Sequence, residues 1–75
     1  MKLTPGMPVS VPILGRDHWN QTDRIGWHEG RLKAVNGDSA LIIFDALVRQ
    51  VLPDDDMTVV SNWAWVPVRT VVGLA

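Results

Sequence analysis

Two stretches rich in apolar residues flank a short polar corner in the middle of the chain. Residues 25–35 and 39–44 carry these stretches, and Asn36, Gly37 and Asp38 separate them. An Asn-Gly pair in this setting favours a type I′ hairpin turn, because both central residues of that turn have positive φ. We therefore predict a long β-hairpin that bends at Asn36 and Gly37.

The segment before this hairpin alternates apolar and polar positions. Val9, Val11 and Ile13 alternate with Ser10 and Pro12, which is the period of a half-buried strand. Proline has no backbone N–H to donate, so we expect this strand to lie at an edge of the sheet, or to leave Pro12 unpaired.

Residues 39–44 are apolar on both faces of the predicted strand. Ala40, Ile42 and Phe44 share one face, and Leu41 and Ile43 share the other. A strand of this kind is covered on both sides, so its second face meets either the same chain or another subunit.

Glycine, proline and small polar residues predict the remaining elements. In chain order these are a long loop over 15–24, a bulge at Gly30, a tight turn at Asp45-Ala46, a strand over 48–52, a 3₁₀ turn over 53–57, a strand over 58–60, and a turn at Ser61-Asn62.

The C-terminal tail is too apolar to lie in solvent. Its aromatic and β-branched residues favour extended structure, and we expect it either to pack on its own chain or to contact a second subunit through Trp63, Trp65, Val66 and Val68. The chain is thus predicted to be one all-β domain over 1–75, with a small barrel of five to six short antiparallel strands over 5–60 and an apolar extension over 61–75.

Composition adds one expectation about assembly. The chain has 75 residues, 47% of them hydrophobic, with four tryptophans and no cysteine. A domain of this size is marginally stable alone, and disulfides and thiolate metal sites are excluded. We therefore expect the chain to form a homo-oligomer, in which a partner subunit adds stability.

Charge and hydropathy limit the partners and the location. The net charge is −1, whereas nucleic-acid-binding proteins usually have a basic surplus, so only a local basic face of Arg31, Lys33 and Arg49 favours nucleic acid. No apolar run is long enough to span a membrane, and the N-terminus has no signal-peptide pattern. We expect a cytoplasmic protein.

Candidate site residues are few. Trp19 lies in the polar loop as either a lid on the core or part of a binding surface, and Trp27 and His28 begin the following strand. Asp54 and Asp55 suit a capped turn, or contact with a basic partner. The spacing of the two histidines does not indicate a metal site, and the sequence contains no phosphate-binding loop. No candidate nucleophile lies next to a candidate base, so we expect neither catalysis nor a cofactor.

These patterns resemble a family of small barrels. The order G-W-H-E-G-R, then N-G-D, A-L-I-I-F-D and P-D-D-D-M is similar to SH3-like domains of the SH3 and Tudor type. The resemblance covers about residues 5–60. It implies a non-catalytic adaptor that binds a protein or peptide partner through Trp19, Trp27 and the Asp-rich turn.

A second similarity is to plasmid-type (type II) dihydrofolate reductases, which are short SH3-like chains that form a tetramer around one pore. Their V-Q-I-Y motif, followed by proline, resembles residues 49–53 here, where Gln50, Val51 and Pro53 match. Leu52 replaces the tyrosine, and Arg49 replaces the first valine. This resemblance implies, as an alternative function, an oligomeric small-molecule or nucleotide-cofactor binder with Gln50 in a shared pore.

Overall fold

The predicted central hairpin is present, with its bend one residue later than expected. The computed structural model describes residues 2–16, 22–52 and 57–74. Strands β2 (Asp23–Asn36) and β3 (Ser39–Leu52) pair in antiparallel fashion, and Asn36 lies opposite Ser39. The two central residues of the turn are therefore Gly37 and Asp38 rather than Asn36 and Gly37. Gly37 takes the positive φ, 61°, that this tight bend requires.

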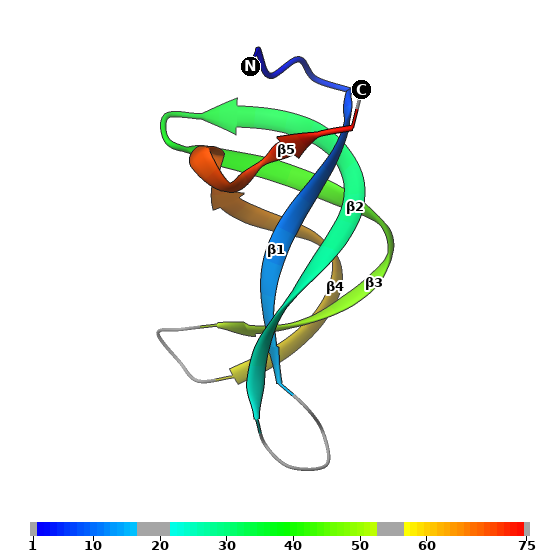
Figure 1. Cartoon of the computed structure of the whole chain (residues 1–75), viewed down its shortest axis with the longest axis vertical. Coiled ribbons are helices and arrows are strands. Elements are labelled where there is room, and N and C mark those ends of the chain that lie inside the picture. The colour runs from blue at the N-terminus through cyan, green and yellow to red at the C-terminus, as the bar shows by residue number, and fades with distance from the viewer. Residues whose placement is uncertain (1, 17–21, 53–56, 75) are drawn as a thin grey trace.

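All the strands belong to one antiparallel sheet, as predicted for an all-β chain. Its order is β4-β3-β2-β1-β5, and the remaining strands are β1 (Pro8–Arg16), β4 (Met57–Pro67) and β5 (Val72–Gly73). The long strands β2 and β3 curve strongly along their length, and β5 lies beside β1 (Figure 1). A 3₁₀ turn over Val68–Thr70 leads from β4 into β5.

The core lies inside this curved sheet and follows the predicted alternation. Val9, Val11 and Ile13 are buried along β1, and Ala40, Ile42 and Phe44 are buried along β3, as the pattern predicted. The main core cluster also contains Leu32, Val48, Ala64, Val66 and Val71. Beyond Ser10, where pairing with β5 ends, β1 pairs only with β2 among the described residues, and Pro12 occupies this edge-like position.

The predicted turn at Asp45-Ala46 is wrong, because β3 continues through it as one strand of 14 residues. The pairing with β4 jumps here from Ile43 opposite Trp63 to Val48 opposite Ser61. The surplus residues of β3 form an irregular, exposed bulge that bends the strand. Small and polar residues suit such a bulge as well as they suit a turn, so the sequence signal was ambiguous.

Two further expectations about the β2 side are corrected. The loop predicted over 15–24 is shorter, because β1 and β2 stay paired as far as Arg16 opposite Asp23. The register of β2 shifts between Leu32 and Ala34, so the bulge lies at Lys33 and not at Gly30.

The C-terminal tail packs within its own chain. The predicted turn at Ser61-Asn62 is wrong, since both residues lie inside the 11-residue strand β4, which pairs with β3. Pairing with β3 continues to Pro67, opposite Ser39. The 3₁₀ turn predicted over 53–57 falls largely outside the described residues, while Met57 begins β4.

Within the described ranges, no helix is long and apolar enough to cross a membrane.

Candidate functional site

The sequence-predicted binding residues are only partly visible. Trp19, Asp54 and Asp55 lie outside the described residues. Trp27 is 60% exposed on β2. His28 is half-buried, and its ring meets Phe44 edge-on at a centroid distance of 6.1 Å.

Trp27 and His28 nevertheless share one recess. It has a volume of about 280 Å³ and lies beside the bulge of β3, with Asp45 and Leu47 also in its wall. Leu47 is 72% exposed, so the bulge presents an apolar side chain next to Trp27. No group of three metal-ligating side chains occurs among the residues that the structure describes.

The tail residues predicted for subunit contact fall into two sets. Val66 is 5% exposed and belongs to the core of its own chain, and Val68 packs against that core. Trp63 and Trp65 are 50% and 49% exposed on β4. Any surface that these residues offer to a partner therefore comes from the two tryptophans.

The two tryptophans cover the second apolar face of β3. Trp63 lies opposite Ile43, and Trp65 lies opposite Leu41, which together form a surface that we call the tryptophan face. Leu41 and Ile43 are half-buried as a result. The second apolar face of β3 is thus partly covered within one chain, and the tryptophans themselves stay half in solvent.

Gln50 borders this surface in a fixed orientation. Its Nε2 donates to Ser61 Oγ at 3.0 Å and to the Trp63 backbone oxygen at 3.1 Å, and Ser61 Oγ donates to the same oxygen at 2.9 Å. A groove of about 270 Å³ runs past these groups, lined by Gln50, Leu52, Val59, Ser61, Trp63, Ala64 and Trp65. Gln50 is therefore a positioned polar group in an otherwise largely apolar groove.

The predicted basic face does not form one surface. Arg31 Nη1 donates to the Gly6 backbone oxygen at 2.9 Å, which ties the N-terminal segment to β2. Lys33 lies at the register shift of β2. Arg49 lies six residues beyond Ile43, the pairing partner of Arg31, on the far side of the β3 bulge.

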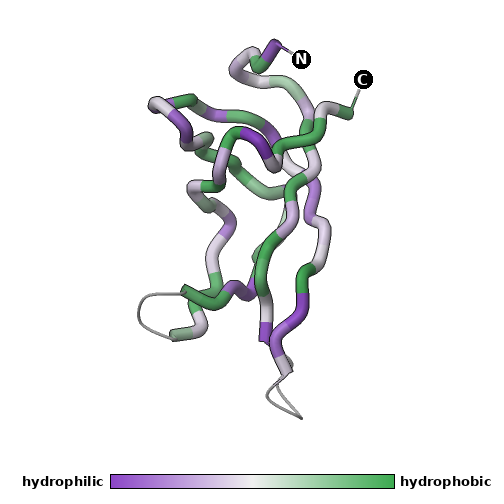
Figure 2. Tube along the Cα trace, turned by 60° about the vertical axis from the view of Figure 1, so that its left-hand side comes forward, coloured by the Kyte–Doolittle hydropathy of each residue, from purple (hydrophilic) through white to green (hydrophobic). Residues whose placement is uncertain are grey.

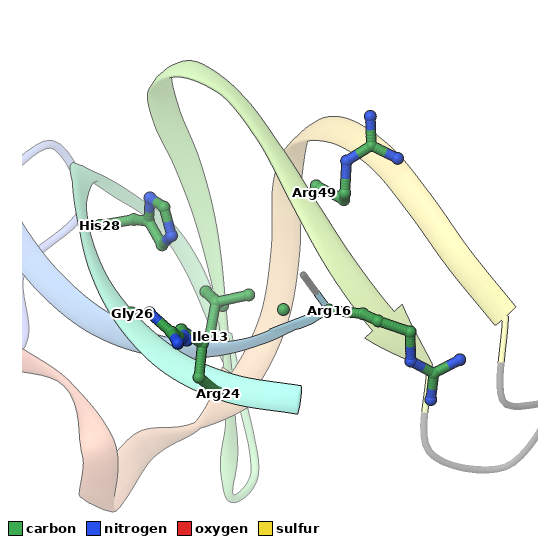
Figure 3. A pocket seen from close by; sticks show the side chains of 7 residues that line it. Ile13, Arg16, Arg24, Gly26, His28 and Arg49 are labelled. Atoms are coloured by element: carbon green, nitrogen blue, oxygen red, sulfur yellow. The ribbon is translucent and has the colours of Figure 1, made fainter. Parts of the chain in front are cut away.

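Arg49 instead joins two arginines that the sequence reading missed. A pocket of about 210 Å³, which we call the arginine pocket, is lined by Ile13, Gly15, Arg16, Arg24, Gly26, His28 and Arg49. Figure 3 shows His28 on one side of it and Arg16 and Arg49 on the other. Arg16 and Arg24 were assigned to an unpaired loop, so only the register of β1 and β2 could have revealed them.

One of these arginines has an acidic partner. Arg16 Nε donates to Asp23 Oδ1 at 2.7 Å, and its Nη2 donates to Oδ2 at 3.3 Å. The hydrogen bond from Arg16, helped by its positive charge, holds the pKa of Asp23 below the ordinary value of 3.8, against a smaller opposing effect of desolvation. The pair fixes the end of the β1–β2 ladder, since these residues face each other in register.

No protein-family model, curated protein or solved structure matches the chain.

Proposed function

We propose that this chain is a non-catalytic interaction module of the SH3-like kind that works as a homo-oligomer, and that a second copy binds along β4 and over the tryptophan face. The observation that carries the proposal is an uncharged strand at the edge of the sheet that holds two half-exposed tryptophans.

The first argument concerns the backbone of β4. This strand pairs with β3 on one side and with no other strand among the described residues, so the opposite row of N–H and C=O groups is open to pairing. Exposed edges are usually protected by charged residues, especially lysine. Met57–Pro67 contains no charged residue, and its one protective feature is Pro67 at the end. An edge of this type is suited to pair with another strand.

The second argument concerns the side chains. A fully buried tryptophan removes roughly 150–250 Å² from solvent, so Trp63 and Trp65 at half exposure offer about 200 Å² together. A stable interface needs roughly 800 Å² from each partner. Met57, 56% exposed on the same strand and on the same face as the tryptophans, and the backbone of an 11-residue strand supply further contact area.

A second copy fits this surface better than an unrelated peptide does. When two β4 strands pair in antiparallel fashion about a two-fold axis, the edge of one copy contacts the same edge of the other copy. A single self-complementary surface is then sufficient for the interface. No charge on the strand opposes this approach. A domain of 75 residues also gains stability from such a partner, because it has little core of its own.

Analytical ultracentrifugation between about 5 and 300 μM tests the proposal. We expect a dimer or larger assembly, and we expect Trp63→Glu and Trp65→Lys to shift it towards monomer, because each places a charge in the contact. Trp27→Glu is the matched control, since Trp27 is at least as exposed but lies on β2. A strict monomer at 300 μM would reject self-association. A monomer that binds an extended peptide along β4 would instead assign the edge to a different partner.

A further inference from the structure

The arginine pocket exists because two glycines remove side chains from the inner surface of β1 and β2. Gly15 lies opposite Arg24, and Gly26 lies opposite Ile13. A Cβ atom at Gly15 would stand 3.3 Å from the Arg49 backbone oxygen, so β3 passes close to β1 at this point. The pairing register and this close passage bring Arg24 and Arg49, which are 25 residues apart in the chain, to the same pocket.

Among the residues that the structure describes, the arginine pocket holds more positive than negative charge. Arg16 is paired with Asp23, which neutralises that arginine locally. Arg24 and Arg49 make no ion pair within the described part of the chain. Arg24 and Arg49 therefore both line this pocket and have no acidic partner among the described residues. Figure 2 shows that hydrophilic residues gather at this end of β1 and β2, next to the grey trace.

Charge and volume together define the class of ligand. Guanidinium groups match the oxygens of carboxylate and phosphate with paired N–H donors. Two unpaired guanidinium groups balance a dianion, and a phosphate monoester carries about −1.5 to −2 charges at pH 7. The pocket has a volume of about 210 Å³ and opens to solvent, so it accepts one phosphoryl group while the substituent extends outward.

We propose that the arginine pocket binds a dianionic phosphoryl group, as free phosphate or as a small phosphate monoester, between Arg24 and Arg49. His28 and Ile13 form the side wall against the substituent, and Gly26 leaves the space that the ligand occupies. The site is independent of self-association through the tryptophan face, because the two surfaces share no residue.

Calorimetric titration of the full chain at low ionic strength tests the proposal with inorganic phosphate, phenyl phosphate and benzoate. We expect one site per chain for the two phosphates, competition between them, and at least about ten-fold weaker binding of the monoanion benzoate. Tighter binding of phenyl phosphate identifies a monoester as the ligand, and equal binding identifies free phosphate.

Variants show whether the pocket is responsible. Arg49→Gln and Arg24→Gln should each weaken phenyl phosphate binding by about ten-fold, because each removes a charge-assisted contact. Arg69→Gln removes the same charge from the exposed 3₁₀ turn and should change the affinity less than two-fold. Gly26→Ala keeps every charge and places a methyl group in the pocket at an ordinary distance of 3.4 Å from His28 Nε2, so it should weaken phenyl phosphate more than inorganic phosphate.

Three results would overturn the proposal. One is an equal loss of affinity in Arg69→Gln and Arg49→Gln, which would mean general attraction to the surface. Another is benzoate binding as tight as that of phosphate. The third is tighter binding of a twelve-nucleotide single strand than of either phosphate, with a steep salt dependence. That result would mean that Arg24 and Arg49 bind the phosphate backbone of a nucleic acid.

Discussion

Replacing Gly30 with alanine tests how closely β2 and β3 pack in this fold. Gly30 is buried and lies opposite Phe44, where the curvature of the sheet brings the two backbones together. A Cβ atom there would overlap the Ile43 carbonyl oxygen and lie 2.9 Å from Phe44 Cα. Both neighbours are backbone atoms, so no side-chain rotation relieves the overlap, and one of the two strands has to move.

The expected magnitude follows from the kind of overlap. Overpacking a core by a methyl group costs about 1–3 kcal/mol, and a clash with backbone belongs at the upper end, at about 3 kcal/mol. Native domains have roughly 0.05–0.15 kcal/mol of stability per residue, which for 75 residues is about 4–11 kcal/mol. The substitution therefore removes a quarter or more of the total. At about 4–8 °C per kcal/mol, Tm should fall by roughly 12–24 °C.

Thermal and urea unfolding at one fixed protein concentration measure this loss, because self-association would make Tm depend on concentration. Gly26→Ala is the matched control. It makes the same change in the same strand, but its new methyl group meets only the His28 side chain at 3.4 Å. We expect its Tm to stay within about 8 °C of the wild type, since Gly→Ala at a permitted backbone position changes stability by only about 0.4–1 kcal/mol. If Gly30→Ala melts as high as Gly26→Ala, the close approach of β2 and β3 is refuted.

The other predictions concern polar contacts. The pKa of Asp23 is held below 3.8 by Arg16, so the pair stabilises the fold above pH 3.8, and this contribution is lost as the pH falls through the lowered pKa. An NMR titration of the Asp23 carboxyl should show a midpoint below 3.8 that rises in Arg16→Gln, and an unchanged midpoint would contradict the assignment. Gln50→Ala removes the two hydrogen bonds that Gln50 Nε2 donates to Ser61 Oγ and to the Trp63 backbone oxygen, and should cost about 1–2 kcal/mol in urea unfolding. Asn62→Ala at a neighbouring exposed position should cost less than about 0.5 kcal/mol.

The alternation of apolar residues was a reliable guide where one face of a strand is buried. Val9, Val11 and Ile13 were predicted to share the core side of a strand, and all three are buried. The hairpin at Gly37 was predictable because a positive φ is a strong local requirement. Both signals are local, so neither depends on what the rest of the chain does.

The errors share one physical cause, which is that strand length depends on partners distant in sequence. Asp45 and Ser61 look like turn residues, yet each lies in a strand whose pairing continues on both sides of a bulge. Composition cannot distinguish a turn from a bulge, because both use small and polar residues. Dividing β3 and β4 in this way made the tail appear to be an extension, although residues 61–67 form more than half of β4.

The arginine pocket was missed for a related reason. Arg24 was placed in a loop because its neighbours are polar, and Arg49 was grouped with Arg31 and Lys33 because all three are basic residues in predicted strands. In the structure, the strand register and the curvature of the sheet instead bring Arg24 and Arg49 to one pocket. Gly15 and Arg24 line the pocket opposite each other in register, and this pairing follows from the length of the β1–β2 ladder, which the sequence pattern underestimated.

The two proposed surfaces meet at adjacent residues of β3, which makes them separable by experiment. Arg49 lines the arginine pocket, and Gln50 lines the groove beside the tryptophan face. Successive side chains of a strand point to opposite faces of the sheet, so a ligand at Arg49 and a second copy of the chain at Trp63 approach from different sides. Trp63→Glu should therefore lower the assembled mass without changing phenyl phosphate affinity, and Arg49→Gln should do the reverse. If either variant changes both measurements, the two sites are coupled through β3, and they have to be treated as one.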